Sequence, residues 1–346
     1  MIKASVIGAT GYAGAELTRL LTSHPDVEIT HLVSHSYAGQ DINQIYKSFD
    51  GKFSRTLDEL DIDMLIRDSD CIFTSLPHAA GGEVIPQLYA GGKTVIDLSG
   101  DYRYNDVSIY EKWYGASHPH PELLKKSVYG LPELHREEIK KARLIGNPGC
   151  YTTCSILALA PLAKAGIIDN SSIVIDAKSG STGAGRSVSQ AMHFCEVNES
   201  AKAYKVASHR HTSEIEQELS LLAGEEIMLS FTPHLLPINR GILATSYAKL
   251  TADVDFDYVY NLYMQAYAPH PFVVVLNNGE LPEIKHVVGS NYIHIGFVID
   301  KRLKRIIVVS VIDNLIKGAA GQAMQNMNLC VGLDETAALK MPAWYL

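Results

Sequence analysis

A glycine-rich turn between a buried strand and a helix constrains this chain more than any other feature. The apolar residues 3–7 are followed by the turn GATGYAG at 8–14, and apolar side chains then recur at helical spacing. Glycines in such a turn let backbone N–H groups approach a pyrophosphate at the positive end of the helix dipole. The spacing GxxGxxG differs from the commoner GxGxxG, so a tight turn without a ligand stays an alternative. We expect a dinucleotide-binding unit with contacts from Gly8, Thr10, Gly11, Tyr12 and Gly14.

The end of the second predicted strand, residues 27–33, indicates which dinucleotide binds. Ser34, His35 and Ser36 follow it, where a chain that binds NAD usually places Asp or Glu against the ribose 2′-hydroxyl. Two hydroxyls and an imidazole suit a 2′-phosphate better than a carboxylate does, although they are also ordinary loop residues. We therefore expect NADP, with Ser34 and Ser36 among its contacts.

Further apolar strands alternate with helical stretches in the first half of the chain. Strands at 71–76 and 94–98, each bounded by turn residues, favour a doubly wound parallel sheet. Ligands lie at the carboxyl ends of such strands. Ser75 and Pro77 are expected to contact the cofactor there, and His78 and Arg103 either face the ligand or are structural. A second, mixed α+β layer is expected from a helix at 256–268 and strands near 227–231, 243–250, 272–276, 292–299 and 305–312.

One cysteine lies where a helix is expected to begin. Cys150 follows the tripeptide Asn147-Pro148-Gly149 and precedes a run with helical spacing. The unpaired N–H groups and the dipole of a helix N-terminus stabilise a thiolate, which is the nucleophilic form of cysteine. Cys150 is therefore a candidate nucleophile, with a structural cysteine as the alternative. Cys154, one turn further on, is expected to pack in the core.

The segment 208–219 holds the densest group of histidines. Thr212 or Ser213 is expected to cap a helix that continues through residue 222, which places His209 and His211 on the preceding loop. Arg210 between them can bind a carboxylate or phosphate through two hydrogen bonds. The alternative is a basic surface loop.

Two more loops offer groups for an anion. Residues 176–186 carry glycines, hydroxyls and Arg186, and such loops present backbone N–H groups to anions. A flexible surface connection is the alternative there. In residues 233–241, Arg240 either contacts an anion or is a solvated loop residue.

Nine ordered segments together resemble the N-acetyl-gamma-glutamyl-phosphate reductase family, within the wider group that includes aspartate-semialdehyde dehydrogenase. They are GATGYAGAEL at 8–17, LPHAAG at 76–81, DLSGDYR at 97–103, YGLPEL at 129–134, GNPGCY at 146–151, SGSTGAGR at 179–186, HRHTSEIEQEL at 209–219, TPHLLPINRGIL at 232–243 and DNLIKGAAGQAMQNMNL at 313–329. The last segment looks like the family's C-terminal helix, which returns to the cofactor domain. The resemblance thus implies a discontinuous Rossmann-like NADP-binding domain, 1–149 with 313–346, and an α+β substrate and oligomerisation domain with a mixed sheet, 150–312.

The resemblance also implies roles for individual residues. Cys150 would be the nucleophile and a histidine of the HRH segment the acid and base; we favour His209, although the sequence does not separate it from His211. Substrate contacts are expected from His211, Arg210, Arg103, Arg186 and Asn147, and further cofactor contacts from Ser179, Gly180 and Asn314. His35 stands where the family usually has arginine, which weakens the inference that this loop binds the 2′-phosphate.

The implied reaction is the NADPH-dependent reduction of N-acetyl-gamma-glutamyl phosphate to N-acetylglutamate 5-semialdehyde and phosphate, through a thioacyl intermediate on Cys150, in arginine biosynthesis. The same chemistry on N-succinyl-glutamyl phosphate, or on an N-acyl-aminoadipyl phosphate of lysine biosynthesis, stays open, because one methylene is worth only about 1–3 kcal/mol in a pocket. A cysteine hydrolase would leave the glycine turn unexplained. A redox sensor with an oxidisable Cys150 would bind NADPH without turnover.

Composition narrows the choice of partners. The net charge of −8 gives no basic surface for nucleic acid, and no apolar run approaches the length of a membrane span. The five cysteines form no CxxC pair, which argues against a zinc site or a disulfide framework. We expect a cytoplasmic chain without a metal, whose partners are the acyl-phosphate substrate and copies of itself in a homodimer or homotetramer.

Overall fold

The chain forms two compact units, which are described here from a computed structural model covering residues 1–78 and 80–344. Unit 1 comprises Met1–Pro148 and Ala319–Lys340, and unit 2 comprises Gly149–Gly318 with the residues from Met341 onward. The chain therefore passes from unit 1 to unit 2, returns to unit 1 after Gly318, and enters unit 2 again at its end.

Unit 1 is built on a six-stranded sheet in the order β2-β1-β3-β4-β6-β5, with every neighbouring pair parallel. Its strands are β1 (Ile2–Ile7), β2 (Val27–Val33), β3 (Cys71–Thr74), β4 (Thr94–Asp97), β5 (Val128–Tyr129) and β6 (Leu144–Gly146). The order reverses at β1, because β2 lies on one side of it and β3 on the other. This arrangement confirms the predicted doubly wound parallel sheet, and such a reversal is where these sheets bind ligands.

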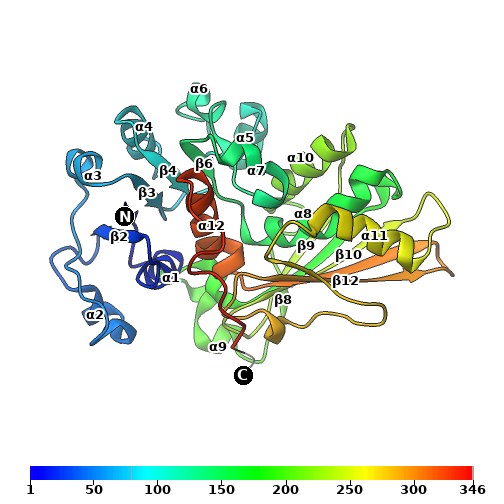
Figure 1. The fold of residues 1–346 in the computed structure, drawn as a ribbon. Coiled ribbons are helices and arrows are strands. Elements are labelled where there is room, and N and C mark those ends of the chain that lie inside the picture. Colours follow the sequence, from blue (N-terminus) through cyan, green and yellow to red (C-terminus); the bar gives the residue numbers. More distant parts are fainter. Residues whose placement is uncertain (79, 345–346) are drawn as a thin grey trace. The chain divides into compact units, whose positions relative to one another are not determined.

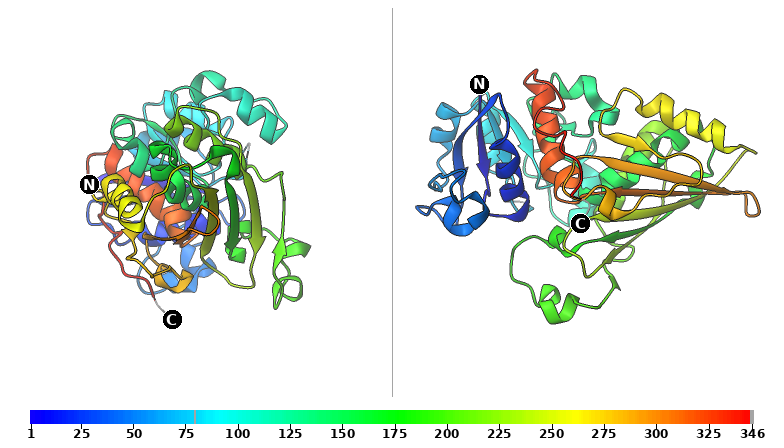
Figure 2. Two further views of the ribbon diagram at one scale, coloured as in Figure 1. Left: turned by 90° about the vertical axis from the view of Figure 1, so that its right-hand side faces the viewer. Right: turned by 60° about the horizontal axis from the view of Figure 1, so that its bottom comes forward.

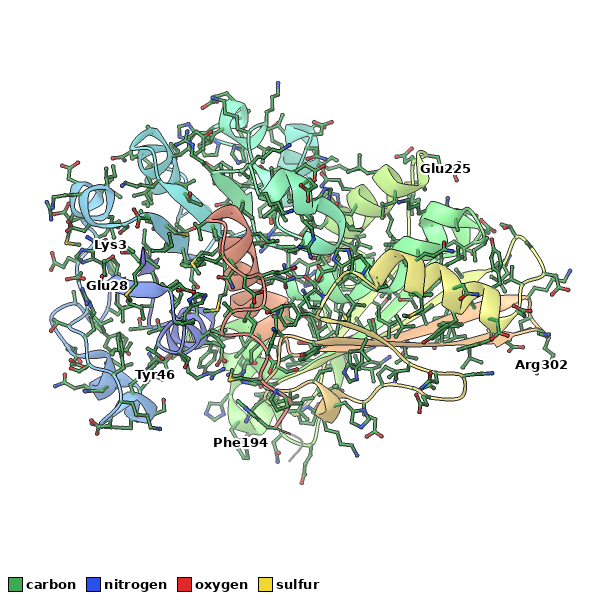
Figure 3. The ribbon with its side chains drawn as sticks, in the orientation of Figure 1. Lys3, Glu28, Tyr46, Phe194, Glu225 and Arg302 are labelled. Atoms are coloured by element: carbon green, nitrogen blue, oxygen red, sulfur yellow. The ribbon has the colours of Figure 1, made fainter. Side chains whose placement is uncertain are left out.

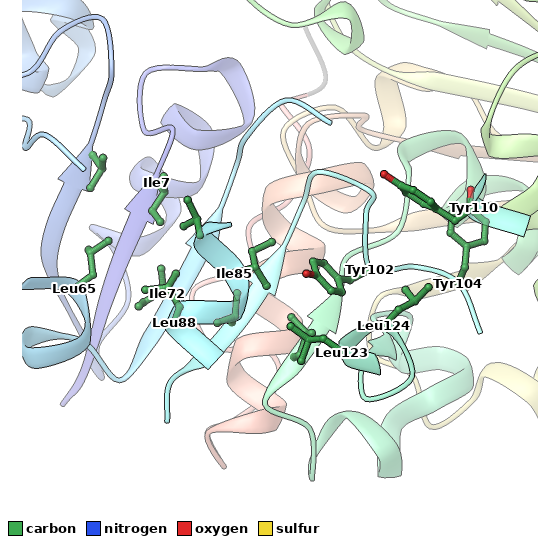
Figure 4. Packing of buried hydrophobic residues seen from close by; sticks show 14 residues of the cluster. Ile7, Leu65, Ile72, Ile85, Leu88, Tyr102, Tyr104, Tyr110, Leu123 and Leu124 are labelled. Carbon is green, nitrogen blue, oxygen red and sulfur yellow. The ribbon is translucent and has the colours of Figure 1, made fainter. Parts of the chain in front are cut away.

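Helices enclose this sheet and supply much of its apolar core. They are α1 (Tyr12–Leu21), α2 (Ile42–Ile45), α3 (Ile62–Asp68), α4 (Val84–Ala90), α5 (Val107–Tyr114), α6 (Pro121–Leu124), α7 (Pro132–Ile139) and α12 (Gly321–Cys330). Figure 4 shows Ile72 and Ile85 in the core, with Tyr102 and Tyr104 packed further along it. Although α12 comes from the end of the chain, it contacts α1, α7 and β4 (Figure 1). Buried side chains from both halves of the sequence thus complete unit 1.

Unit 2 contains a seven-stranded mixed sheet in the order β11-β12-β13-β10-β7-β9-β8. Its strands are β7 (Val174–Ser179), β8 (Lys202–Ala203), β9 (Ser230–Leu235), β10 (Ile242–Lys249), β11 (Val273–Val275), β12 (Ile293–Asp300) and β13 (Arg305–Ile312). The pairs β11/β12 and β7/β9 are parallel, and the other pairs are antiparallel. The predicted α+β unit with a mixed sheet is therefore confirmed.

Three helices of unit 2 gather on one side of its sheet, as Figures 1 and 2 show: α8 (Cys150–Ala165), α10 (His211–Ala223) and α11 (Phe256–Tyr267). The short α9 spans Phe194–Val197. Helix α8 packs on β10 and β13 and is buried along nearly its whole length. Pro161 inside α8 cannot donate a hydrogen bond to the carbonyl of Leu157, and the Tyr267 hydroxyl donates to that carbonyl instead, at 2.6 Å.

The other face of this sheet carries side chains that are half-buried or exposed. In β10, Ala244, Ser246 and Ala248 are buried, whereas Leu243, Thr245 and Tyr247 alternate with them on the opposite face. Val174 of β7 and Val298 of β12 are 41% and 44% exposed. Residues 186–206, green in Figure 2, project from the sheet, and Phe194 on this arm is 73% exposed (Figure 3).

None of the helices within residues 1–78 and 80–344 is long and apolar enough to cross a membrane.

Candidate active site

The glycine turn of unit 1 lies where the strand order reverses, between β1 and α1. Gly8 has a φ of +83°, and a Cβ atom added to it would lie 2.3 Å from the Ser75 carbonyl oxygen at the end of β3. A Cβ atom on Gly14 would lie 2.2 Å from the Gly8 carbonyl oxygen. Both positions therefore require glycine. Gly11 is the N-cap of α1, so the first N–H groups of that helix point toward the turn.

A hydrogen bond joins this turn to the end of β2. The hydroxyls of Thr10 and Ser34 lie 2.8 Å apart, and the Tyr46 hydroxyl donates to the Thr10 carbonyl at 2.9 Å. Ser34 is buried, whereas His35 and Ser36 are exposed. Of the residues predicted at this loop, His35 and Ser36 are therefore the ones available to a ligand in solvent.

The ends of β3 and β4 are held together by a buried carboxylate. Asp97 accepts hydrogen bonds from the hydroxyls of Thr74 and Ser99, both at 2.8 Å. Burial raises the pKa of Asp97, and the neighbouring charge of Asp101 adds to this rise. Arg103 is buried and donates to the Leu98 carbonyl at 3.2 Å. Pro77 and His78 are exposed at the end of β3.

Cys150 begins helix α8, as the sequence predicts. Gly149 is the N-cap, and the Cys150 thiol is partly exposed. Gly318 approaches it closely, because a Cβ atom on Gly318 would lie 2.7 Å from the Cβ atom of Cys150. Cys154 is fully buried against Ser310, and burial raises its thiol pKa to about 12. The expected packing role of Cys154 agrees with these surroundings.

His211 and Glu214 lie against the residue that precedes Cys150. A Cβ atom on Gly149 would lie 2.3 Å from Nε2 of His211, so the imidazole rests directly on the Gly149 backbone. The carboxylate of Glu214 is fully buried, accepts the Gly149 N–H at 3.2 Å and lies 3.9 Å from His211 Nε2. Glu214 was not among the predicted site residues, although its position three residues after His211 puts it on the same helix face.

His209 has different surroundings. It is 9% exposed and lies edge-on to the rings of Tyr151, Tyr204 and Phe231. Burial lowers the pKa of His209 to about 2, with the charges of His211, Lys205 and Arg210 acting in the same direction. Its Nδ1 accepts the backbone N–H of His211 at 3.2 Å, so the neutral ring carries its proton on Nε2.

The helix that carries His211 begins earlier than predicted. Helix α10 begins at His211 itself, so this residue lies in the first helical turn and not on the loop before it. Neither Thr212 nor Ser213 is the N-cap. The Ser213 hydroxyl donates instead to the Arg210 carbonyl at 2.8 Å, which tightens the turn that leads into the helix.

The remaining predicted residues fall into two groups. Asn314 joins two loops of unit 2, because its amide accepts the Gly241 N–H at 2.8 Å and donates to the Thr182 hydroxyl at 3.0 Å. The Ser179 hydroxyl donates to the Gly180 carbonyl at 3.0 Å, and Arg186 is exposed on the loop that follows. In unit 1, the Asn147 amide donates to the Ala319 carbonyl and accepts from Asn326. Both ends of that amide are thus engaged within unit 1.

Arg240 has a partner within unit 2. Its guanidinium pairs with the buried carboxylate of Asp313 at 3.3 Å and lies over the Trp344 ring, 5.3 Å from its centroid. The guanidinium therefore has a protein anion as its partner.

Family models match both halves of the chain. The model described as the NAD-binding domain of semialdehyde dehydrogenase matches residues 3–142, and the model described as the dimerisation domain of semialdehyde dehydrogenase matches residues 150–314. An N-acetyl-gamma-glutamyl-phosphate reductase from Acetivibrio thermocellus is 55% identical over the whole of both chains. The chain belongs to the N-acetyl-gamma-glutamyl-phosphate reductase family. Relatives with the same name from Desulfotalea psychrophila and Pelotomaculum thermopropionicum are 51% and 49% identical, over 99% of each chain.

Solved structures agree with this family at the level of the fold. Aspartate semialdehyde dehydrogenase II from Vibrio cholerae, complexed with ASA, superposes with a TM-score of 0.73 at 17% identity, over 96% of this chain and 98% of that one. The enzyme from Candida albicans, solved with NADP, gives 0.71 at 17% identity over 95% and 98%. The family predicted from the nine sequence segments is confirmed.

Proposed function

We propose that this chain reduces N-acetyl-gamma-glutamyl phosphate to N-acetylglutamate 5-semialdehyde and phosphate, with NADPH as reductant and Cys150 as covalent nucleophile. The observation that carries the proposal is the arrangement at the start of α8, where His211 and the buried Glu214 lie against Gly149, next to Cys150. Membership of a biosynthetic reductase family supplies the reaction, a step of arginine biosynthesis, and we expect it to take place in the cytoplasm.

The position of Cys150 favours a thiolate. As the first residue of α8 it lies at the positive end of a sixteen-residue helix, where the dipole and the unpaired N–H groups stabilise negative charge. The thiolate attacks the acyl carbon, the bond to phosphate breaks, and a thioester forms on Cys150. The same N–H groups are suited to stabilise the oxyanion of the tetrahedral intermediate.

We assign the acid and base role to His211 in place of His209, which the sequence analysis favoured. A proton acceptor for the thiol must be able to hold a positive charge, and the buried carboxylate of Glu214, 3.9 Å away, stabilises an imidazolium on His211. His211 takes the proton of Cys150 and returns it to the departing phosphate. His209 stays neutral, and its Nε2–H is suited to donate a hydrogen bond to the substrate.

The glycine turn of unit 1 fits a dinucleotide. Gly8 and Gly14 allow the close backbone packing of this turn, and the first N–H groups of α1 suit a pyrophosphate. Exposed His35 and Ser36 suit the 2′-phosphate of NADP. NADPH, when bound, supplies a hydride to the thioester carbon. Cys150 then leaves as the thiolate when the tetrahedral adduct collapses to the aldehyde.

We further propose that the substrate is held by cationic side chains. Arg103 and Arg210 suit the phosphate and carboxylate groups, because a guanidinium forms paired hydrogen bonds with either. Arg186 is exposed on its loop, and the Asn147 amide is engaged within unit 1. These two therefore have weaker support as substrate contacts. An N-succinyl or aminoadipyl substrate would use the same groups.

The open face of the unit 2 sheet suits a second copy of the chain. Apolar side chains such as Tyr247, Val298 and Val174 lie on it, and exposed Phe194 lies on the neighbouring arm. Such a surface on a domain of the semialdehyde dehydrogenase dimerisation type supports a homodimer or homotetramer. A single species with the mass of one chain in analytical ultracentrifugation would refute this part of the proposal.

The reaction is tested in reverse by following NADPH formation from N-acetylglutamate semialdehyde, phosphate and NADP+. We compare the wild type with Cys150→Ala and with Cys195→Ala, a matched control because Cys195 is exposed on the arm. Activity that needs phosphate, prefers NADP+ over NAD+ and disappears only in Cys150→Ala is expected. An active Cys150→Ala enzyme would exclude the covalent mechanism.

A further inference from the structure

The close approach of Gly318 to the nucleophile raises the question of what holds this glycine in place. Gly318 belongs to the π-helical turn Ile316–Ala320, and its N–H donates to the carbonyl of Asp313 at 2.9 Å. A π turn is rare and occurs often at functional sites. An added Cβ atom on Gly318 would lie 2.7 Å from Cβ and 3.2 Å from Cα of Cys150. Gly318 therefore packs directly on Cys150. It ends the segment 313–318, which we call the wall segment.

One buried carboxylate fixes the wall segment. The Asp313 side chain is fully buried, and its Oδ1 accepts the N–H groups of Leu315 and Ile316 at 2.8 and 3.1 Å. Its Oδ2 accepts the Gly289 N–H at 2.8 Å and a guanidinium N–H of Arg240 at 3.3 Å. Four donors thus converge on two oxygens that have no access to water, so losing any of them leaves a buried group unsatisfied.

Asn314, the residue after Asp313, contacts two further loops. Asn314 hydrogen-bonds with Gly241 and Thr182, so the wall segment also contacts the loops at 179–186 and 237–241. Trp344 also belongs to this cluster, because its ring lies beside the Arg240 guanidinium and its backbone N–H donates to the Val288 carbonyl at 2.9 Å.

We infer that Asp313 is a positioning residue for Cys150: its carboxylate holds the wall segment against the nucleophile and fixes the direction from which the thiolate meets its substrate. Asp313 does not itself touch the reacting atoms. The inference rests on the proposed role of Cys150, since a wall against a residue without a chemical role would have no effect on turnover.

The variant Asp313→Asn tests the role of this carboxylate by replacing one oxygen with an NH2 group. In one orientation of the amide, the NH2 group faces the N–H groups of Leu315 and Ile316. In the other orientation, it faces the Gly289 N–H and Arg240. We expect the wall segment to move away from Cys150 and kcat to fall by about 100-fold, as for a misplacement of about 1 Å at a reacting centre. Because Gly318 packs on the Cα and Cβ atoms of Cys150, its displacement should open space beside this side chain. Alkylation of Cys150 by iodoacetamide is then expected to become faster while turnover becomes slower.

The other cysteines make the labelling self-controlled when it is resolved by mass spectrometry. Exposed Cys195 reports the intrinsic rate of the reagent, and the fully buried Cys71 and Cys154 report unfolding. The expected result is a higher ratio of Cys150 to Cys195 labelling, with Cys71 and Cys154 still unlabelled. An unchanged ratio with unchanged kcat would overturn the inference. Parallel labelling of Cys71 and Cys154 would indicate general loss of structure in this variant, and the decision then rests on Gly318→Ala.

Asp300 provides a matched control. Its side chain accepts the backbone N–H groups of Arg302 and Leu303 at 3.0 and 3.3 Å, and it pairs with the Arg302 guanidinium at 3.3 Å. Asp313 likewise binds two backbone N–H groups just after it and one arginine. Asp300 is the last residue of β12, and Arg302 in the turn that follows is 82% exposed (Figure 3). Asp300→Asn is expected to keep wild-type kcat and labelling. Equal losses in both variants would refute a specific role for Asp313.

Gly318→Ala keeps the inference testable if Asp313→Asn does not fold, because it disturbs the same wall without altering the carboxylate. We expect kcat to fall while the buried cysteines stay unlabelled; wild-type kcat would contradict the inference. The Cys150→Ala enzyme distinguishes failure of the proposed function from failure of the role assigned to Asp313. If it is active, the proposed function fails; if it is inactive while the wall variants behave as wild type, only the role of Asp313 fails.

Discussion

Replacing each histidine of the HRH segment by asparagine separates the roles assigned to the two imidazoles. Burial lowers the pKa of His209 to about 2. At pH 7 about one molecule in 10⁵ then carries a protonated His209, and placing a proton there costs roughly 7 kcal/mol, since each pKa unit is worth 1.36 kcal/mol. A group with this penalty is a poor acceptor for the proton of Cys150. Removing its hydrogen bond costs about 1 kcal/mol, so His209→Asn is expected to lower kcat by less than about tenfold.

His211→Asn is expected to have a much larger effect. General acid and base catalysis contributes on the order of 10² to 10⁴ in rate, and asparagine fills a similar position without being able to take up a proton. The assay is the pH dependence of kcat/KM, over roughly pH 5 to 9 so that an ordinary histidine titrates within it. The ionisation that limits the rate should disappear in His211→Asn and persist in His209→Asn. A larger loss in His209→Asn, or loss of the ionisation in that variant alone, would refute the assignment.

Three further outcomes follow from the described geometry. The pKa of His209 falls from 6.5 in the unfolded chain to about 2 in the folded one, so below pH 6.5 the unfolded chain binds a proton that the folded chain does not. The contribution of neutral His209 to the free energy of unfolding is complete above that pH, and about 2 kcal/mol of it is lost by pH 5. The free energy of unfolding, measured with urea, should therefore fall less between pH 7 and pH 5 in His209→Asn than in wild type. An equal fall would contradict the low pKa of His209. Gly149→Ala puts a methyl group 2.3 Å from Nε2 of His211, so a fall in kcat on the order of 10² is expected in a folded enzyme, and unchanged kcat would argue against the position of the ring. His35→Asp should raise KM for NADPH and lower it for NADH, because a carboxylate repels the 2′-phosphate and accepts from the 2′-hydroxyl; an unchanged ratio would exclude His35 from the cofactor site.

Local patterns were sufficient to predict most elements of the fold. Strand β2 has its predicted limits, 27–33, and α11 ends one residue short of the predicted 256–268. The errors occur where tertiary pairing replaces local preference. His234 and Pro233 were expected in a loop but belong to β9, which extends to Leu235 because it pairs in parallel with β7. The two- and three-residue strands β5, β6 and β8 are too short to show any periodicity.

The site was predictable where a residue type and its local context suffice. Cys150 before a helical run is such a case, and so is the glycine turn at 8–14. Partners that come from distant parts of the chain leave no local pattern. Nothing in the sequence near Arg240 indicates that Asp313, 73 residues later, will be its partner. Likewise, only the folded chain distinguishes His209 from His211, because the burial that lowers the pKa of one comes from aromatic rings on other elements.

The path of the chain between its two units affects how this protein can be made. Helix α12, whose side chains Gln322, Met324 and Met327 are fully buried, belongs to unit 1 but is translated after nearly all of unit 2. While unit 2 is emerging from the ribosome, the sheet of unit 1 still exposes the apolar surface that α12 will cover. Unit 1 therefore cannot reach its final structure before α12 has been made, and a chain that stops before α12 would leave unit 1 incomplete.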